Sequence, residues 1–366
     1  MIRQLPISFV EPRVQITIAL VALVTPLNST MLAAALPTIR TQFDIGVGEL
    51  TLLVSIYLVA VAVMQPIAGQ LGDAFGTRRI MIFGLLAIIF CSILAASAWS
   101  FPALVSARAL MGVASALAMP NAIAYLRKHF SGTDRLGSIL GINGAVLSAF
   151  AAIGPVIGGV LLLAGWEYIF LVNIPISLIA VFLLFQLKPD FVSGRKALSL
   201  DMMSIFLLLL IFISLVVVGI AISNSRDIFA IVALLIFGVS IIGYWAVFKR
   251  RGLGVVNLNL FTKTNYLFAS IGQGLTNFIL YSLLFAIPLF LIDMRDINHQ
   301  VVSFLLFIIF AGSLVTTPIG GVLADRLGWR YPIVLGSIIL LVGSVALTIV
   351  LQAPIILFFI PFVLIG

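Results

Sequence analysis

The 366-residue sequence is 63% hydrophobic and only 9% charged. So little polar surface cannot cover a water-soluble globule of this size, so the composition excludes a soluble enzyme and predicts a chain embedded in lipid. Apolar runs of about 20 residues recur throughout, each long enough for a helix to cross a bilayer core about 30 Å thick. A transmembrane β-barrel needs short alternating segments, whereas 206–222 is almost continuously apolar.

The net charge of +8 does not indicate nucleic-acid binding, because the basic residues are scattered in small groups between the apolar runs. The single cysteine, Cys91, excludes an intrachain disulfide, and His129 and His299 are expected on opposite sides of the membrane. We therefore predict no metal site and no cofactor. The first apolar run exceeds a signal-peptide core and lacks a small-residue cleavage site, so it is expected to be retained.

The apolar runs predict twelve membrane spans. The first six cover 14–36, 50–71, 80–98, 102–126, 137–163 and 168–187. The second six cover 203–223, 228–248, 265–292, 301–323, 332–351 and 355–366. Because the last run stops at Gly366, we expect a C-terminally truncated chain.

The basic residues predict the orientation. With a cytoplasmic N-terminus, all but four of the 20 Lys and Arg residues lie in cytoplasmic segments. Arg40, Arg226 and Arg295 lie on the other side, and Arg108 lies within a span. Cytoplasmic loops carry the excess of Lys and Arg in membrane proteins, so we expect a multi-pass protein of the cell (plasma or inner) membrane. A monomer is expected.

An internal repeat indicates two related halves. The segment 66–78 recurs at 318–330 with seven of thirteen positions identical, each copy at a predicted cytoplasmic helix end. This is expected for parallel repeats related by an axis along the membrane normal. The copies follow spans two and ten, so the predicted domains are an N-terminal six-helix bundle (1–190), a two-span insert (191–263) and an incomplete C-terminal bundle (264–366). Symmetry then requires fourteen spans in the complete protein.

The first copy of the repeat combines flexible glycines with charged residues in one short loop. It resembles the signature loop between spans two and three of major facilitator superfamily transporters. The resemblance implies a latch in which a carboxylate pairs with a helix terminus and neighbouring cations on the inner side. The alternative is a topology-setting loop with a helix cap. The residues implied in the latch are Gly69, Asp73, Gly76 and Arg78, with Asp325 and Arg330 in the second copy.

Span four contains Arg108 in the stretch 108–116, which resembles the superfamily's arginine motif. The resemblance implies proton transfer or substrate binding, and the alternative is a structural anchor. Asn28 of span one lies at the same depth, where family members commonly have aspartate. Asparagine cannot carry a proton, so three accounts stay open. Protons couple through Asp73, Asp325 or Glu49 at helix ends, through a carboxylate beyond the sequence, or not at all.

Two adjacent strings resemble exporter signatures. The first holds small residues and a proline that favour close packing and a helix bend, and it resembles the antiporter motif of exporter subfamilies. Its residues are Gly154, Pro155, Gly158 and Gly159. Helix packing without any transport role is the alternative. The second, 165–175, resembles the Trp-Phe-Asn-Pro signature of 14-span drug:proton antiporters; Trp166 and Tyr168 suit the membrane interface, and Asn173 must find polar partners.

Span nine presents Gln273, Asn277 and Tyr281 on one helical face. This polar stripe predicts either a wall of a substrate cavity or polar contacts between helices.

Together these features predict an all-α integral membrane protein of the major-facilitator fold, with two six-helix bundles and a two-helix insert. The function expected is alternating-access export of drugs or other amphipathic small molecules in exchange for protons, similar to multidrug and tetracycline-type exporters. The alternative is an uncoupled facilitator or importer of a polar or anionic metabolite anchored by Arg108. A membrane enzyme or scaffold would need a nucleophile or metal cluster, and the sequence presents neither.

Overall fold

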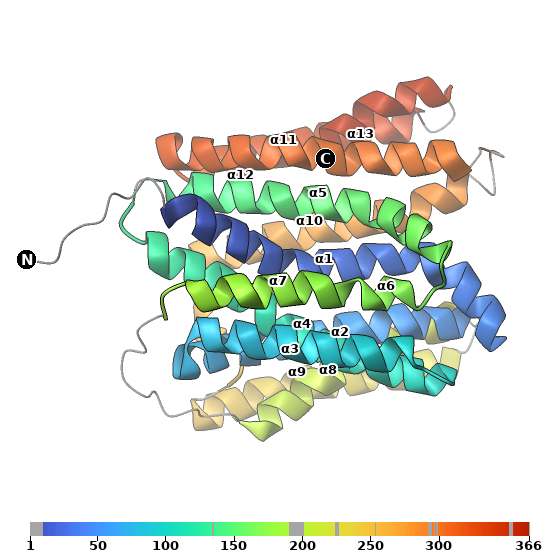
Figure 1. Ribbon diagram of the computed structural model, residues 1–366, viewed down its shortest axis with the longest axis horizontal. Coiled ribbons are helices and arrows are strands. Elements are labelled where there is room, and N and C mark those ends of the chain that lie inside the picture. The colour runs from blue at the N-terminus through green and yellow to red at the C-terminus, as the bar shows by residue number, and fades with distance from the viewer. Residues whose placement is uncertain are drawn as a thin grey trace, which may run out of the picture. The chain divides into compact units, whose positions relative to one another are not determined.

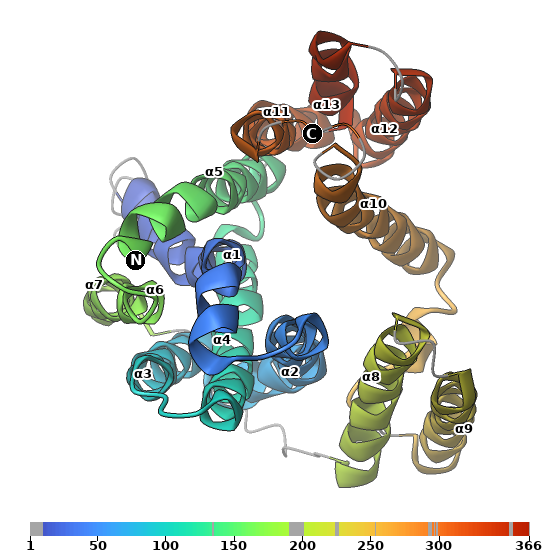
Figure 2. The same cartoon turned by 90° about the vertical axis from the view of Figure 1, so that its right-hand side faces the viewer.

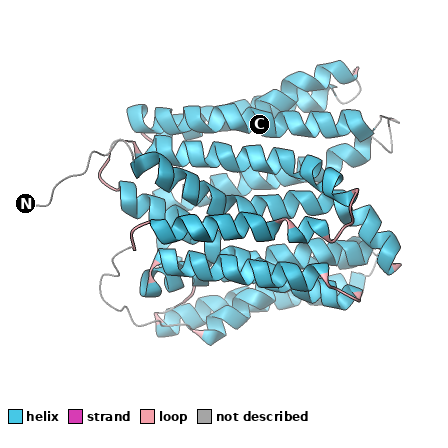
Figure 3. Ribbon diagram, viewed as in Figure 1, coloured by secondary structure: helices cyan, strands magenta, loops and turns pink. Residues whose placement is uncertain are grey.

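The computed structural model describes residues 10–133, 135–189, 201–223, 227–252, 254–291, 295, 297, 299–350 and 354–365. Within these ranges the chain is helical, with short loops and no strand (Figure 3). Ten of the described helices are long and apolar enough to cross a membrane.

The helices follow the predicted spans closely (Figure 1). The first half contains α1 (Val10–Phe43), α2 (Val47–Phe75), α3 (Thr77–Ala96), α4 (Phe101–Phe130), α5 (Leu136–Leu162), α6 (Tyr168–Leu171) and α7 (Asn173–Gln186). The second half contains α8 (Met202–Ser223), α9 (Asp227–Arg251), η1 (Leu258–Leu260), α10 (Thr264–Leu289), α11 (His299–Leu327), α12 (Arg330–Val350), η3 (Ile355–Phe358) and α13 (Phe359–Ile365). Each predicted span overlaps at least one described helix, which confirms the all-α membrane fold. The sixth span is divided between α6 and α7 and the twelfth between η3 and the seven-residue α13, so the count of twelve spans stays a prediction.

The helices extend several residues beyond the apolar runs that predicted them. α1 continues to Phe43 and α4 continues through the basic residues Arg127 and Lys128 to Phe130. Backbone hydrogen bonding does not require apolar side chains, and long basic side chains at a helix end reach the polar interface while their stems stay on the helix.

The described chain forms two compact units. The first contains Met1–His129 and Gly154–Leu258, and the second contains Phe130–Ile153 and Asn259–Gly366. α5 therefore contributes its first part to the second unit and its last part to the first. The bundle boundaries at 190 and 263, which follow from the sequence repeat, stay a prediction.

Within the first unit, the predicted insert forms a hairpin whose two helices, α8 and α9, lie side by side (Figure 2). α8 packs against α2 through a cluster containing Val59, Val63, Leu208 and Tyr244. The segment after α9 is also fixed, because the Gln70 amide on α2 donates to the Val255 carbonyl at 3.2 Å. The insert is thus attached to the helix that carries the first copy of the repeat.

Within the second unit, apolar side chains of α11, α12, η3 and α13 meet in one cluster, which includes Ile309, Leu347, Phe358 and Phe362. These residues are buried although many side chains of the same helices are exposed. The cluster joins the C-terminal helices into one body.

The exposed surface differs from that of a soluble protein because it is largely apolar. Large apolar side chains such as Leu235 and Ile242 of α9 lie exposed, while several polar ones lie buried in the first unit. Lipid as the surrounding solvent explains the exposed apolar surface, because hydrocarbon chains meet these side chains without cost. Buried polar groups must then be satisfied inside the protein, and they mark the candidate site.

Candidate functional site

Arg108 on α4 is the largest fully buried side chain of the described chain, with 1% of its surface exposed. Its guanidinium carbon lies 4.3 Å from the Tyr57 ring centre and 6.0 Å from that of Phe170. Its Nε and Nη1 atoms have no hydrogen-bond partner among the described residues. A desolvated cation–π contact contributes about 2 kcal/mol, whereas a charge at the centre of a span costs at least about 2.5 kcal/mol. The aromatic rings therefore offset only part of the cost.

The approach of α2 and α4 places Tyr57 beside this cation. Gly112 lies one turn beyond Arg108, and a Cβ there would lie 2.6 Å from the Tyr57 carbonyl oxygen and 2.8 Å from the Ala60 Cβ. Only glycine allows the two backbones to come this close. Tyr57 is buried and its hydroxyl donates to the Thr25 carbonyl of α1 at 3.4 Å, so three helices meet at this ring.

Asn28 forms an amide pair with Asn173. The Asn173 Nδ2 donates to the Asn28 Oδ1 at 2.8 Å and also to the Phe170 carbonyl at 3.0 Å. The prediction that Asn173 finds polar partners is thus confirmed. The sequence places Asn28 and Arg108 at the same depth, but they have different partners. Asn28 accepts from Asn173, whereas Arg108 lies over the Tyr57 ring.

Trp166 is buried among aromatic side chains, and its expected position at the membrane interface stays a prediction. Its ring centre is 5.7 Å from that of Phe43 and 5.9 Å from that of Phe170, both in edge-on geometry. Gly165, at φ 140°, begins the turn that leads the chain into α6 and directs the indole inward. Tyr168 is 47% exposed. The 165–175 string therefore positions Phe170 and Asn173 beside Arg108 and Asn28.

The antiporter-type string lies within continuous α5 and packs closely on α1 at one of its glycines. A Cβ at Gly154 would overlap the hydroxyl of Thr30, whereas Gly159 has open space around its Cα. Gly158 is buried, and the side chain of Pro155 lies outside the described residues. The close approach predicted from the small residues is present at Gly154, and a transport role for the string stays a prediction.

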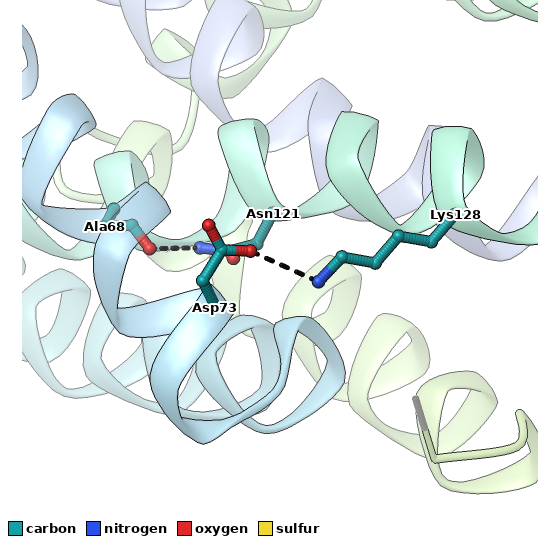
Figure 4. Close-up of polar contacts among 4 residues, drawn as sticks. All are labelled: Ala68, Asp73, Asn121 and Lys128. Carbon is teal, nitrogen blue, oxygen red and sulfur yellow. Dashed lines mark hydrogen bonds and ion pairs between the residues drawn. The ribbon is translucent and has the colours of Figure 1, made fainter. Parts of the chain in front are cut away.

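The first copy of the repeat binds neighbouring helices through several polar groups. Arg78 caps the C-terminal end of α7, donating from Nε to the Leu184 carbonyl at 2.7 Å and from Nη2 to the Phe185 carbonyl at 2.9 Å. Asp73, with a 65% exposed side chain, pairs with Lys128 at 3.3 Å (Figure 4). The turn itself passes through Gly76 at φ 96°, which favours glycine. Gly69 has open space around it.

Asn121 of α4 is a buried polar residue that sequence reasoning did not single out. Its amide donates to the carbonyl of Ala68 on α2 at 2.9 Å (Figure 4). It also donates to the carbonyl of Leu117 on its own helix at 2.9 Å. A Cβ at Gly72 would overlap this amide. A lone asparagine inside an apolar span was the available signal.

The second copy of the repeat binds a helix N-terminus directly. The Asp325 carboxylate at the end of α11 accepts hydrogen bonds from the backbone amides of Gly137 and Ser138 at 2.8 and 2.7 Å, and from the Ser138 hydroxyl. Free amides and the helix dipole make the start of α5 favourable for a negative charge. Gly321, one turn earlier, lies against the Gly137 backbone. Arg330 begins α12, is exposed and makes no recorded polar contact with described residues.

The polar stripe of span nine lies on α10. Gln273 and Asn277 are exposed, and the side chain of Tyr281 lies outside the described residues. Their role in a cavity wall stays a prediction.

Comparison with known proteins decides the family. The sequence profile of the Major Facilitator Superfamily matches residues 18–366. The chain belongs to the Major Facilitator Superfamily. It is therefore a multi-pass membrane transporter and not an enzyme.

Similar proteins include both exporters and a vitamin transporter. The MFS-type transporter YvkA of Bacillus subtilis is 30% identical over 77% of this chain and 63% of its own length. The riboflavin transporter RibZ of Clostridioides difficile is 27% identical over 86% of this chain and 68% of its own. The tetracenomycin C resistance and export protein of Streptomyces glaucescens is 32% identical over 53% of this chain and 36% of its own.

The fold has solved counterparts. The proton:xylose symporter XylE superposes with a TM-score of 0.67 at 14% identity, covering 98% of this chain and 78% of that one. This similarity establishes the major-facilitator fold. The chain spans 63% of the length of YvkA and 68% of that of RibZ, so substrate and coupling are matters for proposal.

Proposed function

We propose that this chain belongs to a secondary transporter that exports hydrophobic or amphipathic compounds in exchange for protons by alternating access. The observation that carries the proposal is the buried Arg108, since an ionisable residue kept within a span at high energetic cost marks a functional site. Export is supported by the tetracenomycin C export protein, which resembles this chain at 32% identity.

The contact between Asp325 and the first turn of α5 supports an alternating-access cycle. A carboxylate that binds a helix N-terminus is a local interaction that stabilises one conformation over another. Asp73 is the equivalent residue in the first copy of the repeat, and its exposed carboxylate pairs with Lys128. We assign Asp325 and Asp73 to a latch on the side predicted to be cytoplasmic, with Arg78 fixing α7 beside it.

Proton coupling in this proposal does not run through Asn28. The amide pair with Asn173 cannot change charge, so the proton-carrying group is a carboxylate elsewhere. Among the described residues, Asp73, Asp325 and Glu49 lie at helix ends and stay candidates.

A second candidate is transport of a polar or anionic metabolite without proton coupling. The similarity to a riboflavin transporter and the unpartnered Nε and Nη1 groups of Arg108 support it. The two candidates differ in their dependence on a pH gradient.

Cellular accumulation tests the proposed direction. The full-length protein is produced in cells that lack their own exporters, and the steady-state content of ethidium is compared with that of cells carrying an empty vector. We expect lower ethidium in the producing cells, and restored accumulation after a protonophore. Equal accumulation in both strains, with the protein present in the membrane, would argue against export.

A further inference from the structure

We propose that Arg108, Tyr57 and the polar side chains beside them form a binding site for a small monovalent anion. The ligand class comprises halides and carboxylates, whether as a free ion or as the anionic group of a transported compound. The site lies within the first unit at the junction of α1, α2 and α4. It is independent of the direction of transport and goes beyond the proposed export function.

The first argument is an excess of hydrogen-bond donors. The Nε and Nη1 groups of Arg108 can only donate, and both lack an acceptor among the described residues. The buried hydroxyls of Thr25 and Ser115 lie near the Tyr57 hydroxyl, and each can also act as a donor. The Asn28–Asn173 pair does not change this balance, since it leaves one amide nitrogen and one amide oxygen unpartnered.

The second argument is charge. In the described part of the first unit, ion pairs join Lys128 with Asp73 and Arg251 with Asp201, all at helix ends. Arg108 has no carboxylate partner there, and the neighbouring amides of Asn28 and Asn173 carry no charge. Because buried charges are stable when paired, a ligand that brings one negative charge and two or more acceptor positions completes the site.

The third argument is shape. The planar guanidinium stacks on Tyr57 at 4.3 Å, so its faces are used by aromatic contacts and its edge carries the free N–H groups. Nε–H lies on the edge shared with Nη2, whereas Nη1 lies on the side of Cδ, so the two free groups point to different sides of the guanidinium and each can donate a single hydrogen bond to an anion. The side chain is also held rigidly, because the α2 backbone contacts Gly112 one turn away. A buried cation with free N–H donors favours an anion over a neutral ligand.

Thermal unfolding of the purified full-length protein in detergent tests the site. Chloride alone, benzoate alone and methyl benzoate alone are titrated at constant ionic strength and pH, with gluconate as the bulky replacement anion. We expect a saturable rise in the unfolding midpoint with chloride, benzoate or both, and none with neutral methyl benzoate. A response to chloride identifies a free-ion site, and one to benzoate alone identifies a site for the anionic group of a substrate.

Three variants make the result specific. Arg108→Met removes the donors and should abolish the saturable response. Arg108→Lys keeps the charge without the planar guanidinium, so the anion concentration at half-maximal response should rise about tenfold. Asn28→Asp places a carboxylate in the same polar region, and it should raise the midpoint in gluconate and reduce the response to added anions. If Arg108→Met does not fold, the other two variants carry the test.

Two outcomes would overturn the proposal. One is an unfolding midpoint of the unaltered protein that is the same in every anion. The other is a response of equal size in the unaltered protein and in all Arg108 and Asn28 variants, which would show a general salt effect.

Discussion

The contact between Asp325 and the start of α5 gives the sharpest mechanistic prediction. Asp325→Asn retains one acceptor oxygen but removes the charge and places an NH₂ group where the second oxygen accepts from Ser138. Losing an N-terminal cap costs about 0.5–2 kcal/mol, and charged acceptors lie at the upper end. Because this carboxylate is exposed to solvent, we expect Asp325→Asn to reduce the local stability of the first turn of α5 by about 1–2 kcal/mol.

Amide hydrogen exchange measures this loss at its origin. The amides of Gly137 and Ser138 are the donors, so peptides covering 135–142 should exchange about 5- to 30-fold faster in Asp325→Asn, the factor that corresponds to about 1–2 kcal/mol. Asp227→Asn removes an equally exposed carboxylate in the first turn of α9 and should leave these peptides unchanged. Unchanged exchange in Asp325→Asn, or an equal increase in both variants, would refute the reasoning.

Three further predictions concern the first unit. Gly154→Val should destabilise the protein by about 1–3 kcal/mol because the side chain overlaps Thr30, whereas Gly159→Val in the same string should be tolerated; equal midpoints in a thermal unfolding experiment would contradict this. Arg78→Gln should cost about 1–3 kcal/mol through the lost caps on Leu184 and Phe185, and Arg79→Gln, on the exposed side, should cost less than 0.5 kcal/mol; equal losses on thermal unfolding would contradict this. The Ser204 hydroxyl and the Arg251 guanidinium hold the pKa of Asp201 below its ordinary value. The stabilisation that ionised Asp201 gives the α8–α9 hairpin is therefore present at neutral pH and lost as pH falls through that lowered pKa. Hydrogen exchange of the first turn of α8 should rise at acidic pH, and Asp201→Asn should remove this pH dependence.

The membrane fold could be predicted from the sequence because its determinants are local. Helices in lipid must satisfy their own backbone hydrogen bonds, so each apolar run of sufficient length reports a helix without reference to the rest of the chain. The repeat at 66–78 and 318–330 likewise identified the position of Asp325 at a helix end. Its acceptance of the α5 amides agrees with the helix-terminus pairing implied by the superfamily resemblance.

The partners of the polar residues could not be predicted in the same way, since they depend on which helices cross and at what rotation. Depth along a helix placed Asn28 and Arg108 at one level, but depth does not give the direction of a side chain around its axis. Only the structure therefore identifies Tyr57 as the neighbour of Arg108 and Asn173 as the partner of Asn28. Trp166 shows the same limit, because its amphipathic ring suits an interface by composition and a turn at Gly165 buries it.

Transport by the full-length protein in everted membrane vesicles tests the central claim most directly. Vesicles acidified inside are given ethidium. The uptake of ethidium is followed by the change in its fluorescence, with the pH gradient intact and after its collapse. Exchange for protons predicts accumulation of ethidium in the vesicle interior that disappears when the gradient is collapsed and is reduced in Asp325→Asn. Accumulation that is absent under both conditions, or that is independent of the pH gradient, would contradict proton-coupled export.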